Sequence, residues 1–221
     1  MKSTLLILLT LGVISCTTRQ ESQDIQETIP IEEKVDLTTL YPELAERINN
    51  KYSTPLGNYY KLTMSTDSTC RIEWGNSKIK KLTNDDYHFH FARRFSFEWE
   101  NKDFLVLRTW TGTGAWFSLF LPLDSLTSES TIENTLTKNE GQNLVVAEQF
   151  PGTDTIMYIL NLKTKQIQFI KDKAKCETFN HLCLDTVILV NRKLYYKWST
   201  PHRFMENPNL KTVERNIDVK I

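Results

Sequence analysis

The sequence has no excess of charge of either sign, and it lacks features that mark several classes of protein. Its 221 residues include 27 basic and 27 acidic side chains. Binding to nucleic acid needs a positive footprint, so we expect no nucleic acid among the partners. Glycine and proline occur seven times each, which argues against a low-complexity chain.

Catalytic motifs are equally scarce. No Gly-x-Ser-x-Gly, His-Glu-x-x-His or Cys-x-x-Cys pattern occurs, and the chain has four histidines. The first two patterns mark hydrolases, and the third is typical of zinc sites. We therefore expect no cofactor and favour a protein that is not an enzyme.

His88-Phe89-His90 is the candidate metal motif. On a strand, residues i and i+2 face the same side, so His88 and His90 could begin a metal site. Catalytic zinc commonly takes three protein ligands, and the sequence names no third one. A polar strand face opposite Tyr87, Phe89 and Phe91 is the favoured interpretation.

The amino-terminal residues have the pattern of a secretory signal peptide. Lys2 supplies a positive charge, and Leu5 to Ile14 form an apolar run with one glycine and one threonine. A helix that crosses a bilayer needs about 20 apolar residues, so this run is too short to span one. We assign residues 1–15 to the signal peptide.

Val13-Ile14-Ser15-Cys16 ends this segment and resembles the bacterial lipobox. The resemblance covers residues 1–16. It implies that the Cys16 thiol receives a diacylglyceryl group, that the signal is cut before Cys16, and that the new amino terminus is acylated, for example with palmitate. Two or three acyl chains anchor a protein stably, at about 0.8 kcal/mol per buried methylene. An ordinary signal peptide followed by a coincidental cysteine is the alternative.

The position after the cysteine bears on the destination. Thr17, in place of Asp, resembles lipoproteins that are sorted to an outer membrane. We therefore expect a cell-envelope protein that is held by its lipid anchor and faces the periplasm or the exterior.

Two further regions follow the signal peptide. Residues 16–36 are polar, acidic and poor in aromatic side chains, so they cannot bury enough apolar surface to order themselves. We interpret them as a flexible tether. Residues 37–221 have a length that suits a single domain.

Three cysteines remain after Cys16, namely Cys70, Cys176 and Cys183. An odd number allows one disulfide at most and leaves one free thiol. Cys176–Cys183 is the favoured pair, because the segment between them looks like a loop that leads into a strand. A pairing of Cys70 is the alternative.

One amino-terminal helix is expected over residues 36–52. Leu37, Leu40, Leu44 and Ile48 recur at spacings of three and four. Pro42 suits the first turn of such a helix.

After Pro55 the pattern predicts short strands that are rich in β-branched and aromatic residues. They are Tyr59–Met64, Cys70–Trp74, Lys78–Leu82, Tyr87–Phe91, Phe95–Trp99, Phe104–Thr109, Trp116–Leu121, Leu144–Gln149, Ile156–Leu160, Gln166–Ile170, Thr186–Val190, Leu194–Trp198 and Thr212–Val219. Residues 123–142 are expected to be a loop or a short helix. No alternation of strand and helix occurs, so we predict a mainly β, antiparallel domain.

A faint repeat suggests how the strands are grouped. Phe104-Leu-Val-Leu recurs as Leu144-Val-Val-Ala and as Val187-Ile-Leu-Val, at intervals of about 40 residues. These intervals resemble the blades of a β-propeller, of which this chain could hold about four. A sandwich or an open barrel is the alternative.

Exposed tryptophan and arginine side chains are common anchors of protein interfaces. Trp198 ends a predicted strand just before Pro201, and His202 and Arg203 follow that proline. Trp198, His202 and Arg203 therefore form the predicted recognition patch.

The favoured function is a binding module with a protein partner, such as an immunity protein. The alternatives are a periplasmic or surface metal-assisted hydrolase and a structural assembly lipoprotein.

Overall fold

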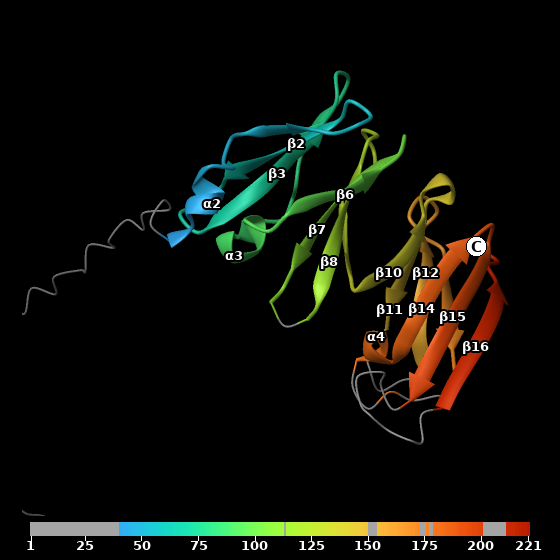
Figure 1. The fold of residues 1–221 in the computed structure, drawn as a ribbon. Coiled ribbons are helices and arrows are strands. Elements are labelled where there is room, and N and C mark those ends of the chain that lie inside the picture. Colours follow the sequence, from blue (N-terminus) through green and yellow to red (C-terminus); the bar gives the residue numbers. More distant parts are fainter. Residues whose placement is uncertain (1–39, 113, 150–153, 173–175, 177–178, 201–210) are drawn as a thin grey trace, which may run out of the picture. The chain divides into compact units, whose positions relative to one another are not determined.

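The computed structural model describes residues 40–112, 114–149, 154–172, 176, 179–200 and 211–221 (Figure 1). These residues fall within one compact unit, Lys34–Ile221. The unit is mainly β, as predicted, and consists of four antiparallel sheets with a few short helices. The strands of the described residues do not form a closed barrel. The resemblance to propeller blades stays a prediction.

Each sheet is built from strands that are consecutive in the chain, with one exception, β5, which pairs with β3. The first sheet contains β1 (Lys51–Ser53), β2 (Tyr59–Met64), β3 (Thr69–Gly75), β4 (Lys80–Leu82) and β5 (Tyr87–His88). The second contains β6 (Ser96–Glu100), β7 (Phe104–Trp110), β8 (Trp116–Pro122) and β9 (Ser130–Glu133).

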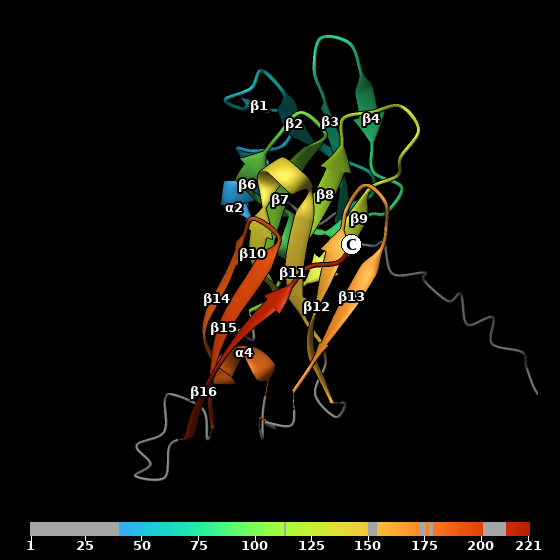
Figure 2. The same ribbon diagram turned by 90° about the vertical axis from the view of Figure 1, so that its right-hand side faces the viewer.

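The third and fourth sheets complete the unit. The third contains β10 (Thr135–Asn139), β11 (Leu144–Glu148), β12 (Thr155–Asn161) and β13 (Ile167–Lys171). The fourth contains β14 (Leu184–Val190), β15 (Lys193–Thr200) and β16 (Lys211–Asp218), which lie side by side in both views (Figure 2). The helical elements are α2 (Pro42–Ala45), α3 (Phe89–Ala92), α4 (Asn180–Cys183) and the 3-10 helix η1 (Glu140–Gln142).

Three apolar clusters join each sheet to the next. Side chains of β2 and β3 meet those of β7 and β8 in the first cluster, and the second and third sheets share another. The last cluster joins the third and fourth sheets. Strands β7 and β11 are therefore buried on both faces, because alternate side chains enter different clusters.

This packing explains the repeat that the sequence contains. On β7, Leu105 and Leu107 enter the first cluster, while Phe104 and Val106 enter the one shared with the third sheet. A strand buried on both faces needs an unbroken apolar run. The third copy of the run lies on β14, where one face is open, and Ile188 is 46% exposed.

The helix predicted over residues 36–52 is wrong in its length. The described part begins at residue 40, and α2 ends at Ala45. Pro42 does stand in its first turn, as expected. Asn49 has a positive φ of 64° and donates its backbone N–H to Leu62 O, so the chain turns to join β2 instead of continuing the helix.

The prediction for residues 123–142 is also wrong in part, because they contain β9 and β10 besides η1. Both strands are short and polar. β9 reads Ser-Thr-Ile-Glu and is buried at Ile132 alone. One apolar side chain gives no alternation by which the sequence could reveal a strand.

Candidate functional site

Trp198 does not belong to an exposed patch. Its side chain is 0% exposed and lies in the cluster between the third and fourth sheets. β15 is the middle strand of its sheet, and Leu194, Tyr196 and Trp198 alternate onto its inner face. The predicted recognition role of Trp198 is therefore wrong. His202 and Arg203 lie outside the described residues.

His88 and His90 do not share a strand face. The strand ends at His88, and Phe89 begins α3, in which Phe89 and Ala92 are buried at helical spacing. His88 caps this helix, since its Nδ1 accepts a hydrogen bond from the His90 backbone N–H at 3.1 Å. The strand interpretation was wrong because i, i+3 burial replaces alternation here. No group of three metal-ligating side chains occurs among the described residues.

The cysteines have distinct environments. Cys176 and Cys183 form a disulfide with their Cα atoms 6.0 Å apart. Cys70 is free and buried on β3, and burial raises the pKa of its thiol to about 12. Cys16 lies outside the described residues. None of the helices within those residues is long and apolar enough to cross a membrane.

An open groove follows the edge of the second sheet. It has a volume of about 790 Å³ and is lined by residues 127–133, Glu148, Gln149, Tyr158, Leu160, Lys165, Ile167 and Phe169. We call it the β9 groove, because β9 forms one wall. Its floor is apolar, with Phe169 57% exposed and Ile167 47% exposed.

The groove exists because the second and third sheets are offset. β8 lies against β10, and β9 lies against β11. The second sheet ends at β9 within the described residues, so it places no strand opposite β12 and β13. Tyr158 pairs with Phe169 across those two strands, and Leu160 pairs with Ile167. These four side chains stay partly or largely open to solvent.

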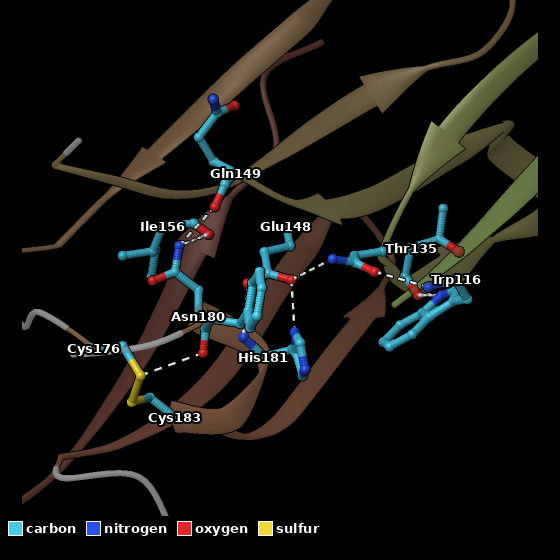
Figure 3. Close-up of polar contacts among 11 residues, drawn as sticks. Trp116, Thr135, Glu148, Gln149, Ile156, Cys176, Asn180, His181 and Cys183 are labelled. Carbon is cyan, nitrogen blue, oxygen red and sulfur yellow. Dashed lines mark hydrogen bonds and ion pairs between the residues drawn. A yellow bond between two sulfur atoms is a disulfide. The ribbon is translucent and has the colours of Figure 1, made fainter. Parts of the chain in front are cut away.

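Glu148, at the end of β11, is a buried carboxylate where the groove meets α4 (Figure 3). Its Oε2 accepts hydrogen bonds from Asn134 Nδ2 at 2.9 Å and from His181 Nδ1 at 2.8 Å. Its Oε1 accepts from the His181 backbone N–H at 3.1 Å. Because a carboxylate can only accept, Nδ1 carries the proton, and the ring is held in one orientation.

The helix α4 is fastened to the third sheet by its own side chains. Asn180 Nδ2 donates to Gln149 O at 2.8 Å and to Ile156 O at 3.1 Å. The disulfide joins Cys176 to Cys183, the last residue of α4, so the loop that it closes contains the helix. Cys176 Sγ lies 3.4 Å from Phe179 O, and as a disulfide sulfur it has no proton to donate to that oxygen. His181 is therefore positioned by the disulfide, by the hydrogen bonds of Asn180 and by its own hydrogen bonds to Glu148.

Four aromatic rings extend from this point over the surface. Trp110 and Trp116 have centroids 5.3 Å apart, Trp116 lies 5.7 Å from His181, and His181 stacks on Phe179 at 5.6 Å. We call them the aromatic row. Trp110 is 50% exposed and Phe179 is 45% exposed. The Trp116 indole N–H donates to Thr135 O at 3.1 Å, as Figure 3 shows, and this bond fixes the central ring.

The groove and the aromatic row form one continuous surface. Glu133 and Glu148 line the groove, and together with Asn134 and Phe179 they also line a small adjoining pocket. Among the described residues, Glu148 is the hydrogen-bonding partner of the His181 imidazole, and no hydroxyl or thiol donates a hydrogen bond to that ring. The arrangement can orient a ring and bind apolar or cationic groups.

Sequence reasoning missed this surface. The aromatic density around Trp110 and Trp116 is visible in the sequence, and the Gly112–Gly114 turn between them indicates a hairpin tip. The groove could not be found in this way, because it arises from the offset of two sheets. Comparison with family models, curated proteins and solved structures gives no match for this chain.

Proposed function

We propose that this chain is a lipid-anchored envelope protein whose β unit binds a partner protein through the β9 groove. The anchor is the one implied by the lipobox resemblance at Cys16. The observation that carries the binding role is the uncovered apolar floor of the groove, with Phe169 more than half exposed.

The physical argument concerns the cost of this exposure. An exposed aromatic ring on a strand keeps apolar area in water that burial would stabilise by about 25 cal/mol per Å². Contiguous apolar surface with a polar rim is typical of interaction sites. Here Glu129, Glu133 and Lys165 surround the floor, and the aromatic row extends the surface with two tryptophans, which are common anchors of interfaces.

The test compares two variants that each remove an exposed apolar side chain from a strand. Phe169→Thr alters the groove floor, and Ile188→Thr alters the open face of the fourth sheet, with 46% of Ile188 exposed. Full-length protein is extracted from its own cells in detergent, and bound proteins are measured by quantitative mass spectrometry.

We expect wild type and Ile188→Thr to recover the same stoichiometric partner. Phe169→Thr should recover at least about tenfold less, because truncation of a central anchor costs about 2 kcal/mol or more. Equal recovery by both variants would place the binding surface elsewhere. If none of the three proteins recovers a partner, the binding role is wrong.

A further inference from the structure

We propose that the β9 groove binds an extended peptide segment of the partner, which adds as a new strand to the free edge of β9. This inference rests on the proposed function and names the chemical class of the ligand. It comes from the backbone of β9, the floor beside it and a carboxylate at one end of the groove.

The first observation is an unpaired strand edge. β9 pairs with β8 in a register that places Ile132 opposite Ser118 and Glu133 opposite Phe117. Asn134 donates its backbone N–H to Trp116 O at 2.8 Å, so every second residue of β9 directs its backbone groups at β8. Thr131 and Glu133 therefore direct their backbone N–H and C=O groups away from β8. No described residue forms a hydrogen bond with these backbone groups. Both residues line the groove.

The second observation is the space beside this edge. Since β9 lies against β11, a strand added next to β9 would lie over β12. Ile132 of β9 packs towards the third sheet, in one cluster with Val145 and Ala147. The added strand's side chains on the same face would reach the floor formed by Tyr158, Leu160, Ile167 and Phe169, which favours apolar residues at alternate positions.

The third observation is a carboxylate without an ion-pair partner among the described residues, at one end of the groove. Glu133 is exposed and has no ion-pair partner among the described residues. It lies beside Asn134, whose side chain bonds Glu148. Lys165 lies in the turn between β12 and β13, at the opposite end of the third sheet. The geometry therefore favours a peptide with a basic side chain near the Glu133 end, on the face that alternates with the apolar one.

The probe is a library of short random peptides displayed on phage and selected on the full-length protein in detergent. Affinities of the enriched peptides are then measured by fluorescence anisotropy. We expect the enriched sequences to alternate apolar and polar residues and to carry a basic residue, whose contribution Glu133→Gln should reduce.

A matched pair of variants isolates the backbone contact. Thr131→Pro removes a backbone N–H that points away from β8, which a free edge tolerates, and Thr131→Ala removes the same side chain but keeps the N–H. We expect peptide affinity to stay within about twofold for Thr131→Ala and to fall at least about tenfold for Thr131→Pro. Phe169→Thr should weaken peptide binding whether or not the peptide adds as a strand, because Phe169 forms part of the groove floor.

The outcomes separate this inference from the proposed function. Strand addition would be overturned if the peptides bind Thr131→Pro and Thr131→Ala with equal affinity but bind Phe169→Thr weakly. The groove would then remain the binding site. Failure to enrich any peptide would overturn strand addition, whereas the role in partner binding is decided by the pull-down. Peptide binding that is insensitive to all three variants would overturn both. A dimer of the full-length protein that Thr131→Pro dissociates would identify a second copy as the occupant, and would overturn the partner peptide.

A second measurement keeps the test independent of how well Thr131→Pro folds. Hydrogen exchange of wild-type amides is followed by NMR with and without the best peptide. Exchange at Thr131 and Glu133 should slow at least about tenfold, while Ile132, already bonded to β8, should change little. Unchanged exchange at Thr131 and Glu133 in the saturated complex would overturn strand addition.

Discussion

At the scale of single residues, burial decides which side chains are chemically available. Cys70 and Trp198 are both 0% exposed, although the residues around each of them in the sequence do not indicate that its side chain is buried. The inner face of a strand can be read from alternation, as on Leu194, Tyr196 and Trp198, but which strand lies in the middle of a sheet cannot. This is why the sequence located the strand around Trp198 and misplaced its function.

Cys70 gives the prediction at this scale. Burial raises its thiol pKa to about 12, so almost no thiolate exists in the folded protein at pH 8. We expect iodoacetamide to leave Cys70 unmodified in the native protein and to alkylate it fully in denaturant, as measured by peptide mass spectrometry. Native Cys70 that reacts as fast as a free thiol would contradict this environment.

At the scale of elements, alternation and turn residues predicted most strands. β2 was predicted with its observed bounds, and β7, β8 and β12 were each predicted within one residue at either end. The short elements were missed where tertiary contacts override local pattern. α3 replaces the end of a predicted strand because Phe89 and Ala92 are buried together, and β9 is recognisable only through its pairing with β8.

The disulfide gives the prediction for an element. A closed loop as short as that between Cys176 and Cys183 contributes about 2–3 kcal/mol in the chain-entropy account. We expect the double variant Cys176→Ser/Cys183→Ser to lose about that much free energy of unfolding, measured in urea, and to show faster amide exchange in α4, including His181. The core of β7 should keep its protection.

A reductant provides the control for that variant. It should lower the stability of the wild type by a similar amount and leave the double variant unchanged. Equal exchange rates in α4 with and without the disulfide would show that Asn180 and Glu148 position His181 without it.

At the scale of the whole molecule, the sequence predicted a mainly β antiparallel unit but not the offset of its sheets. Composition and alternation report which residues are apolar, whereas the offset depends on how Ile132, Val145 and Ala147 interdigitate between two sheets. The groove is a product of that offset, so it could not be predicted from any local segment.

The proposed lipid anchor gives the prediction for the whole molecule. We expect wild-type protein to incorporate radiolabelled palmitate and to sediment with membranes, and Cys16→Ser to lose both properties. The circular dichroism of the Cys16→Ser protein should remain that of a β protein. A Cys16→Ser protein that still carries label would contradict the lipobox interpretation.

The construction of each sheet from consecutive strands has a consequence for the folding pathway. Strand pairing between chain neighbours closes short loops, which costs little entropy and favours rapid formation of each sheet by itself. The slow steps should be the docking of one completed sheet on the next, because β7 and β11 need neighbours on both faces. A chain interrupted after β13 would leave Leu144 and Val146 facing water, so intermediates at that stage are expected to be the ones prone to aggregate.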